Sequence, residues 1–131
     1  PESQLEVVFF VDRSLGGKLV VQALRAAGAS IVAHDDVFAQ DTQDVEWLAE
    51  AGHRNWIVLT KDSAIRRNAL EKLMFRESRV RVFVLPRRDL RGEEMAAIFV
   101  RALPGMRNRA RSIAPPFLFS IARGGGFTRL E

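Results

Sequence analysis

The sequence predicts an α/β fold, a three-layer α/β/α sandwich around a mainly parallel sheet, with a C-terminal β-hairpin extension. Three observations favour it. Short apolar runs recur along the chain, which is typical of strands buried on both faces. Segments with helical periodicity separate these runs, as in parallel sheets. Near the end, two apolar runs flank a run of glycines, the pattern of a hairpin.

The first strand is expected at residues 7–11 and is followed by a helix. Ser14 can cap this helix and Gly28 can end it. Its apolar residues recur at a spacing of four, which would turn one face toward the sheet. These residues are Leu15, Leu19, Ala23 and Ala27. The second strand is expected at residues 30–34, before a polar loop.

The middle of the chain repeats this alternation. A second helix is expected from about residues 42–44 to Gly52, with Val45, Leu48 and Ala51 turned inward. The third strand covers residues 56–60. Asn68, with Glu71 three residues later, forms a capping-box pattern that opens the next helix.

The last part of the chain contains a strand, a helix and the hairpin. The strand is expected at residues 80–85, and a helix is expected at 92–103, ended by the Pro104–Gly105 pair. The hairpin falls within residues 115–130. We therefore expect a single domain with its core at residues 7–104 and a basic extension at residues 105–131.

Composition narrows the class of protein. The 131 residues suit one domain with a real core. The absence of cysteine excludes disulfides and thiolate metal sites. The lack of cysteine is also compatible with a reducing cytoplasm, which is the expected location. No apolar run approaches the roughly 18 residues of a membrane span, so we expect no membrane partner.

Charge is divided unevenly along the chain. Residues 1–71 carry 7 basic and 11 acidic side chains, whereas residues 72–131 carry 13 basic and 5 acidic ones. Twelve of those 13 basic residues are arginines, which suit bidentate contacts to phosphate. This asymmetry suggests an acidic metal site beside a track for a polyanion. A solvated basic surface is the alternative.

Acidic residues follow the predicted strands. Asp12 and Asp62 come just after the first and third strands, and the connection after the second strand supplies Asp35, Asp36, Asp41 and Asp44. Because ligands bind beyond the carboxyl ends of parallel strands, these acids are expected at one edge. Crowded carboxylates repel one another, and Mg²⁺ or Mn²⁺ relieves that repulsion. A metal-activated water then makes phosphodiester hydrolysis the natural chemistry. Each acid taken singly could instead be a loop or cap residue.

The segment FFVDRSLGGKLVVQALRAAGASIVAHDDVFAQDTQDVEWLAEAGHRNWIVLTKDSAIRRN, residues 9–68, resembles a PIN-like domain, most closely the toxins of VapC type. The similarity extends through residues 83–104. It implies a Mg²⁺- or Mn²⁺-dependent endoribonuclease, a hydrolase of RNA phosphodiester bonds. It also implies the toxin of a type II toxin–antitoxin pair, which a cognate antitoxin holds inactive and which often forms a homodimer.

The resemblance assigns the catalytic metal ligands to Asp12, Asp44 and Asp62. The sequence differs from the family's pattern of acids at two positions. Arg13 occupies the place where related short nucleases carry a second acid, and only Asp89 is available as the acid after the fourth strand. Asp41 could serve as an outer ligand. One metal ion with several waters is therefore expected rather than two ions.

Basic residues near the same edge are candidates for RNA binding; they are Arg13, Lys61, Arg66 and Arg67. Helix-end electrostatics is an equal alternative for each one. Two other functions remain open. One is a non-catalytic PIN-fold module that binds nucleic acid or protein. The other is a receiver-like phosphoacceptor domain, which Arg13 and the early position of Lys61 fit poorly.

Overall fold

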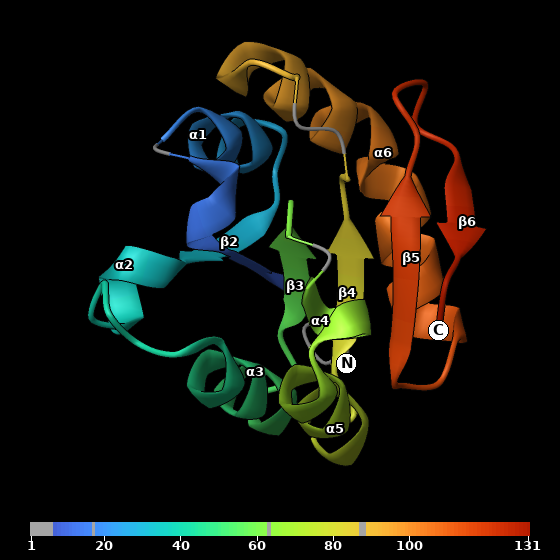
Figure 1. The fold of residues 1–131 in the computed structure, drawn as a ribbon. Helices are drawn as coiled ribbons and strands as arrows, with labels where there is room; N and C mark the ends of the chain where they lie inside the picture. The colour runs from blue at the N-terminus through green and yellow to red at the C-terminus, as the bar shows by residue number, and fades with distance from the viewer. Residues whose placement is uncertain (1–6, 17, 63, 87–88) are drawn as a thin grey trace, which may run out of the picture.

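The structure, a computed structural model, describes residues 7–16, 18–62, 64–86 and 89–131. Its strands form one six-stranded sheet in the order β2-β1-β3-β4-β5-β6 (Figure 1). All neighbouring pairs are parallel except β5 and β6, which form the antiparallel C-terminal hairpin. The strands are β1 (Val8–Val11), β2 (Ser30–Ala33), β3 (Ile57–Thr60), β4 (Arg81–Val84), β5 (Phe117–Ile121) and β6 (Phe127–Arg129). The predicted fold class is confirmed.

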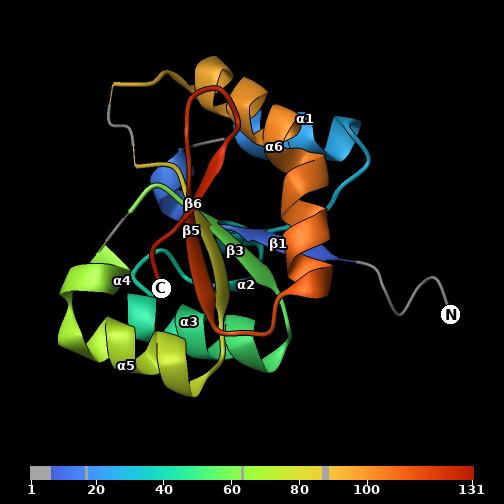
Figure 2. The same cartoon turned by 90° about the vertical axis from the view of Figure 1, so that its right-hand side faces the viewer.

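Helices cover both faces of this sheet, as Figure 2 shows. Helices α1 and α6 lie on one face, and α3 and α5 lie on the other. The helical elements are the 3₁₀ turn η2 (Arg13–Leu15), α1 (Leu19–Ala26), α2 (His34–Val37), α3 (Asp44–His53), α4 (Ala64–Arg67), α5 (Ala69–Glu77) and α6 (Gly92–Ser112). The chain passes from β1 to β2 on one side and then returns to β3 on the other. This reversal of strand order beside β1 creates a crevice of the kind in which open α/β sheets bind ligands.

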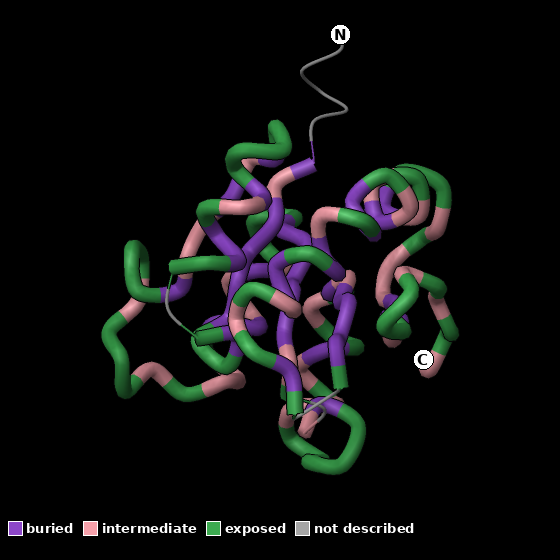
Figure 3. The backbone as a smooth tube through the Cα atoms, turned by 90° about the horizontal axis from the view of Figure 1, so that it is seen from above, coloured by how far each residue is buried: buried purple, intermediate pink, exposed green. Residues whose placement is uncertain are grey.

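Two hydrophobic cores fill the space between the layers. Successive strand residues point to opposite faces, so Phe9 joins the core beneath α1 and α6 while Phe10 joins the core beneath α3 and α5. Both rings are 0% exposed. Figure 3 shows the buried residues concentrated in the central strands. Burial on both faces explains why these strands read as continuous apolar runs.

The first helix differs from its prediction. The chain turns through η2, and Gly16 then adopts a left-handed conformation with φ of 86° before α1 begins. The helical phase therefore restarts at Leu19, which is 50% exposed instead of buried. The residues of α1 that are buried are Val20, Val21 and Leu24. Of the predicted inner face, Leu15 is buried and Ala23 packs partly buried against the core, whereas Leu19 and Ala27 are exposed. The cap at Ser14 is wrong, and Gly28 follows the end of the helix as predicted.

Two further boundaries were misplaced. Strand β2 ends one residue early, and His34 opens the short helix α2 where a loop was expected. Helix α3 passes through Gly52, and Asn55, with φ of 60°, takes the left-handed position after the helix. Gly52 is needed for packing, because a Cβ there would lie 2.2 Å from the carbonyl oxygen of Ser78 at the end of α5.

Helix α6 continues through Pro104 to Ser112, so the predicted break at residues 104–105 is wrong. A proline removes one helical hydrogen bond, and the buried face of this 21-residue helix outweighs that loss. Gly105 serves packing, since a Cβ there would lie 2.6 Å from the ring of Phe127 on β6. Within the described ranges, no helix combines the length and apolar character that a membrane crossing requires.

Candidate active site

Asp12 follows β1 at the C-terminal edge of the sheet and is only 7% exposed. Its backbone N–H donates to the carbonyl oxygen of Leu59 at 3.0 Å, which extends the pairing of β1 with β3. Its Oδ2 accepts hydrogen bonds from the hydroxyls of Ser14 and Thr60, both at 2.8 Å. Two donors on one oxygen fix the orientation of this buried carboxylate.

The Thr60–Lys61–Asp62 sequence at the end of β3 forms the second part of the site. The Thr60 hydroxyl donates to Asp12 and accepts from the backbone N–H of Asp62 at 3.0 Å. The backbone N–H of Lys61 donates to the Ser14 hydroxyl at 3.0 Å. Asp62 Oδ1 accepts from the backbone N–H of Ala64 at 2.8 Å, at the start of α4. One threonine hydroxyl thus connects the aspartates that follow β1 and β3.

Asp44 is the first residue of α3, and its Oδ1 accepts a hydrogen bond from the Trp47 indole at 2.9 Å. Partial burial is the main cause that raises the pKa of Asp44 above its usual value. The Trp47 hydrogen bond opposes this rise, while the charges of Asp12 and Asp62 add to it. The aspartates from three separate connections therefore lie within electrostatic range of one another.

Glu71 is a fourth acid that sequence reasoning missed. Its backbone N–H donates to Asn68 Oδ1 at 3.0 Å, as the capping-box pattern predicts. Its carboxylate, however, lies in the field of the aspartates. Partial burial, followed by the charges of Asp44, Asp62 and Asp12, raises the pKa of Glu71 to about 7. We refer to Asp12, Asp44, Asp62 and Glu71 as the acid cluster.

The remaining acids are not among those whose charges raise the pKa of Asp44 or Glu71. Asp41 is exposed in the loop before α3, and the carboxylates that raise the pKa of Asp44 are those of Asp12 and Asp62. Asp89 is exposed after β4. Asp35 and Asp36 lie on α2 and form ion pairs with Arg13 and Arg25. No sequence signal separates these acids from Glu71, because only the packing of α5 decides which carboxylate meets the aspartates.

The candidate RNA-binding residues lie in the segments that follow β1 and β3. Arg13 belongs to η2, where its guanidinium is 3.5 Å from Asp35 and also donates to the carbonyl oxygen of Gln40 at 2.6 Å. Lys61 is partly buried, and Arg66 and Arg67 are exposed on α4. These cations therefore share the edge of the sheet with the acid cluster.

Several arginines of the basic second half have structural partners. Arg81 is buried enough to lower its pKa, and it donates to the carbonyl oxygens of Ala110 and Asn55. Arg107 donates to the carbonyl oxygen of Gly28, and Arg109 stacks on the Phe127 ring with its guanidinium 4.0 Å from the ring centroid. The last turns of α6 lie near the start of β5, at the opposite edge from Asp12. Much of the arginine content thus stabilises the packing of α6 and the hairpin.

The acid cluster suits a hard divalent cation by the chemistry of its donors. Carboxylate oxygens are the preferred ligands of Mg²⁺ and Mn²⁺, and two of these carboxylates have raised pKa values that a cation would relieve. Among the described residues, no three histidine, aspartate or glutamate side chains lie close enough to hold one ion directly. The geometry therefore fits an ion that touches one or two carboxylates and reaches the others through water, as Mg²⁺ commonly does.

Replacing Thr60 with valine is expected to lower the turnover of any metal-dependent reaction at this site by about 10- to 100-fold. Valine fills the same buried volume, but it removes the hydroxyl that connects Asp12 and Asp62. Steady-state kinetics should show the loss in kcat more than in KM. Thr60→Ser retains the hydroxyl and should stay close to wild type. Full activity in a folded Thr60→Val protein would contradict this positioning role.

Glu71 gives the metal-free protein a pH-dependent stability. Its pKa is about 7 in the folded state against 4.5 ordinarily, so its contribution to stability is present below pH 4.5 and is lost as the pH rises through about 7. Glu71→Gln stays neutral and should have the larger free energy of unfolding above pH 7. Allowing for solvent screening of this partly exposed group, we expect a difference of about 1 kcal/mol. Denaturant unfolding in a chelator, from pH 4.5 to 8, measures it.

The matched control for this experiment is Glu77→Gln, an exposed position on the same helix. Its unfolding curves should follow those of the wild type across the pH range. Equal free energies of unfolding for Glu71→Gln and wild type at pH 8 would show that the aspartate charges do not destabilise the ionised Glu71.

Comparisons with known proteins place the chain in a family. A family model described as "PIN like domain" matches residues 7–87. The chain is also 35% identical over 116 residues to "Putative ribonuclease VapC45" of Mycobacterium tuberculosis (strain ATCC 25618 / H37Rv). That alignment covers 86% of this chain and 83% of the relative. No solved structure matches this chain.

Proposed function

Because this chain belongs to the PIN-like domain family, we propose that it is a metal-dependent endoribonuclease that hydrolyses RNA phosphodiester bonds. One observation carries the proposal. Asp12, buried and oriented by hydroxyls of Ser14 and Thr60, lies within electrostatic range of Asp44 and Asp62 at the C-terminal edge of the sheet. The relative, whose name is "Putative ribonuclease VapC45", supports the same activity.

We assign metal binding to Asp12, Asp44 and Asp62, with Asp41 as an outer ligand through water. A bound Mg²⁺ or Mn²⁺ supplies Lewis acidity and a coordinated water of lowered pKa. The chain's own contribution is orientation. Thr60 holds Asp12 and the backbone of Asp62 in fixed relation, and Trp47 does the same for the Asp44 carboxylate.

Two kinds of side chain complete the proposed mechanism. Glu71 has a pKa of about 7 without a metal. A bound cation would lower that pKa, so Glu71 would then be a carboxylate able to accept hydrogen bonds from waters of the ion. Arg13, Lys61, Arg66 and Arg67 would bind the RNA backbone, since they lie in the segments that follow the same strands. The charge of the transition state would be offset by these cations.

The direct test uses the purified protein and an end-labelled single-stranded RNA. Titration with Mn²⁺ is expected to produce discrete fragments, and excess chelator is expected to stop cleavage. RNA that is bound but uncut at every Mn²⁺ concentration would support the non-catalytic binding module instead. Covalent labelling by acetyl phosphate would support the receiver-like alternative.

We further propose that the protein is the toxin of a type II toxin–antitoxin pair, with RNA as substrate, a cognate antitoxin as partner and a homodimer as a possible assembly. The resemblance of its sequence to VapC-type toxins supports this role. Expression in a bacterial host should then arrest growth, and the Asp12→Asn variant should not. Growth that is unaffected by an active, soluble enzyme would contradict the toxin role while leaving the nuclease proposal in place.

A further inference from the structure

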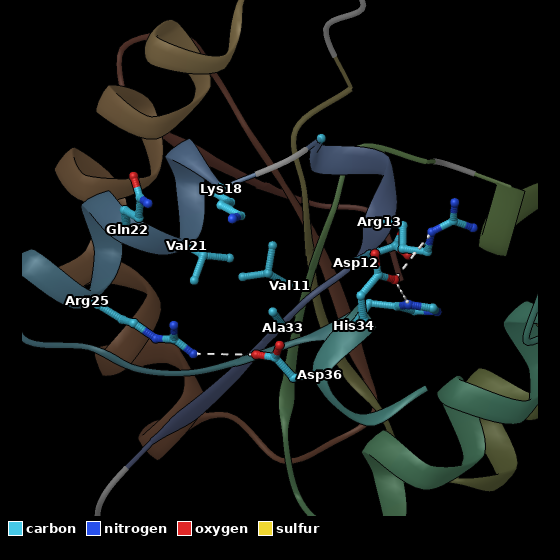
Figure 4. A pocket seen from close by; sticks show the side chains of 12 residues that line it. Val11, Asp12, Arg13, Lys18, Val21, Gln22, Arg25, Ala33, His34 and Asp36 are labelled. Atoms are coloured by element: carbon cyan, nitrogen blue, oxygen red, sulfur yellow. Dashed lines mark hydrogen bonds and ion pairs between the residues drawn. The ribbon is translucent and has the colours of Figure 1, made fainter. Parts of the chain in front are cut away.

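A pocket of about 470 Å³ opens beside Asp12, on the β2 side of β1. This volume lies within the roughly 300–1,000 Å³ typical of sites for small molecules. The pocket is walled by the ends of β1 and β2 and by residues of η2, α1 and α2 (Figure 4). Asp12 is the member of the acid cluster that lines it. We refer to this space as the side pocket.

The side pocket has an apolar middle and polar ends. Val11, Val21 and Ala33 lie together in its centre, as Figure 4 shows. Arg25 and Asp36 lie at one end, and Asp12 lies at the other. An apolar centre between two polar ends suits a flat heteroaromatic ring whose edge and whose attached phosphate make separate contacts.

The polar end distant from Asp12 offers a donor beside an acceptor. Arg25 and Asp36 are 3.8 Å apart, and their side chains are 52% and 63% exposed. Such an exposed pair is held weakly, so either group can exchange its partner for a ligand. Arg25 also donates to the carbonyl oxygen of Ile31 at 3.0 Å, which anchors the guanidinium at this place.

The wall between these ends carries a cation suited to phosphate. Lys18 lines the side pocket just before α1 and has no ion-pair partner among the residues that the structure describes. Arg13, in contrast, lies 3.5 Å from Asp35, and that carboxylate also contacts the buried His34 at 2.8 Å. Lys18 is therefore a cation of this pocket that can neutralise a phosphate next to Asp12 without first leaving a carboxylate of the described residues.

We infer that the side pocket receives one unstacked nucleotide of the RNA, the one that adjoins the scissile phosphate, and that it prefers guanine. The inference rests on the proposed nuclease function. The base lies over Val11, Val21 and Ala33, and its phosphate lies toward Lys18 and Asp12. Guanine presents two adjacent donors, its ring N–H and its amino group, beside a carbonyl acceptor. A carboxylate next to a guanidinium, as in Asp36 and Arg25, matches that edge better than the edges of the other bases.

Mapping of cleavage sites tests the preference. A single-stranded RNA of mixed sequence, cut by the protein with Mn²⁺, should show guanine enriched at a fixed position beside the cut. Arg25→Ala and Asp36→Asn should each reduce this enrichment by about tenfold. Arg54→Ala, which removes an exposed arginine paired with Glu50 at the other edge of the sheet, should retain it. Cutting by the wild type without base preference would overturn the inferred choice of guanine.

A second measurement separates this inference from the nuclease proposal. Binding of guanosine and adenosine 5′-monophosphates is followed by NMR in chelator, so no cleavage is required. The guanosine nucleotide should bind more tightly by about tenfold, and Asp36→Asn and Lys18→Ala should weaken it while Arg54→Ala does not. Binding of this kind without any RNA cleavage would support the inferred nucleotide site and contradict the nuclease proposal. The inference that the side pocket binds guanine would be contradicted if the protein cleaves RNA but binds the two nucleotides equally. It would also be contradicted if the protein binds neither nucleotide.

Discussion

Asp12→Asn is expected to abolish RNA cleavage, with a loss on the order of a thousandfold or more, and to leave the fold intact. Asparagine has the same shape and can still accept hydrogen bonds from Ser14 and Thr60 through its amide oxygen. The substitution removes the negative charge that a divalent cation needs at the buried end of β1. The measurement is the cleavage rate of single-stranded RNA at saturating Mn²⁺.

The stability of this variant distinguishes a chemical effect from unfolding. The charge of Asp12 raises the pKa of Asp44 and of Glu71, so its removal relieves repulsion inside the acid cluster. In chelator, Asp12→Asn should therefore be at least as stable as the wild type. Glu77→Gln changes charge equally at an exposed position on α5 and should cut RNA normally. Substantial cleavage by Asp12→Asn would remove the central residue from the proposed mechanism.

Phe10→Ala is expected to reduce the free energy of unfolding by about 3–5 kcal/mol, a large part of the stability of a domain of this size. The Phe10 ring is 0% exposed and stacks on Trp56 at a centroid distance of 5.4 Å. It also packs against Trp47 at 5.4 Å and Phe38 at 5.7 Å. Truncation would leave a cavity among rings contributed by several elements.

This cavity should also affect the site, because Trp47 both packs on Phe10 and donates to Asp44. We expect Phe10→Ala to lower cleavage even at temperatures where it remains folded. Denaturant unfolding followed by tryptophan fluorescence measures the stability, and Phe10→Leu is the control that retains most of the volume. A loss below about 1 kcal/mol for Phe10→Ala would mean that the neighbouring rings close over the space.

The strands and the edge that they share could be predicted from the sequence because both depend on local patterns. Buried strands have apolar residues on both faces, so β1 and β3 are visible as runs, and Asp12 and Asp62 are visible as the acids that follow them. The parallel direction of the strands then places those acids at one edge without knowledge of any contact. This is why Asp12 and Asp62 could be placed together, whereas only the resemblance to PIN-like domains singled out Asp44 among the acids that follow the second strand.

The remaining site residues depend on packing that no local pattern records. Ser14 was expected to cap a helix, but η2 and Gly16 separate it from α1, and its hydroxyl instead binds Asp12. Glu71 fits its capping pattern and also lies near the aspartates, and only the docking of α5 reveals the second property. In the same way, Pro104 suggests a helix end, yet the buried face of α6 keeps the helix continuous.

Because β1 lies between β2 and β3, Asp12 at the end of β1 is flanked by different elements on its two sides. The residues proposed for chemistry come from the β3 side, whereas α1 and α2, which wall the side pocket, flank β2. Changes at pocket-lining positions of α1 and α2 such as Arg25 and Asp36 could therefore redirect the protein to other targets during evolution without disturbing hydrolysis. Selection could then diversify the choice of substrate and preserve the catalyst independently.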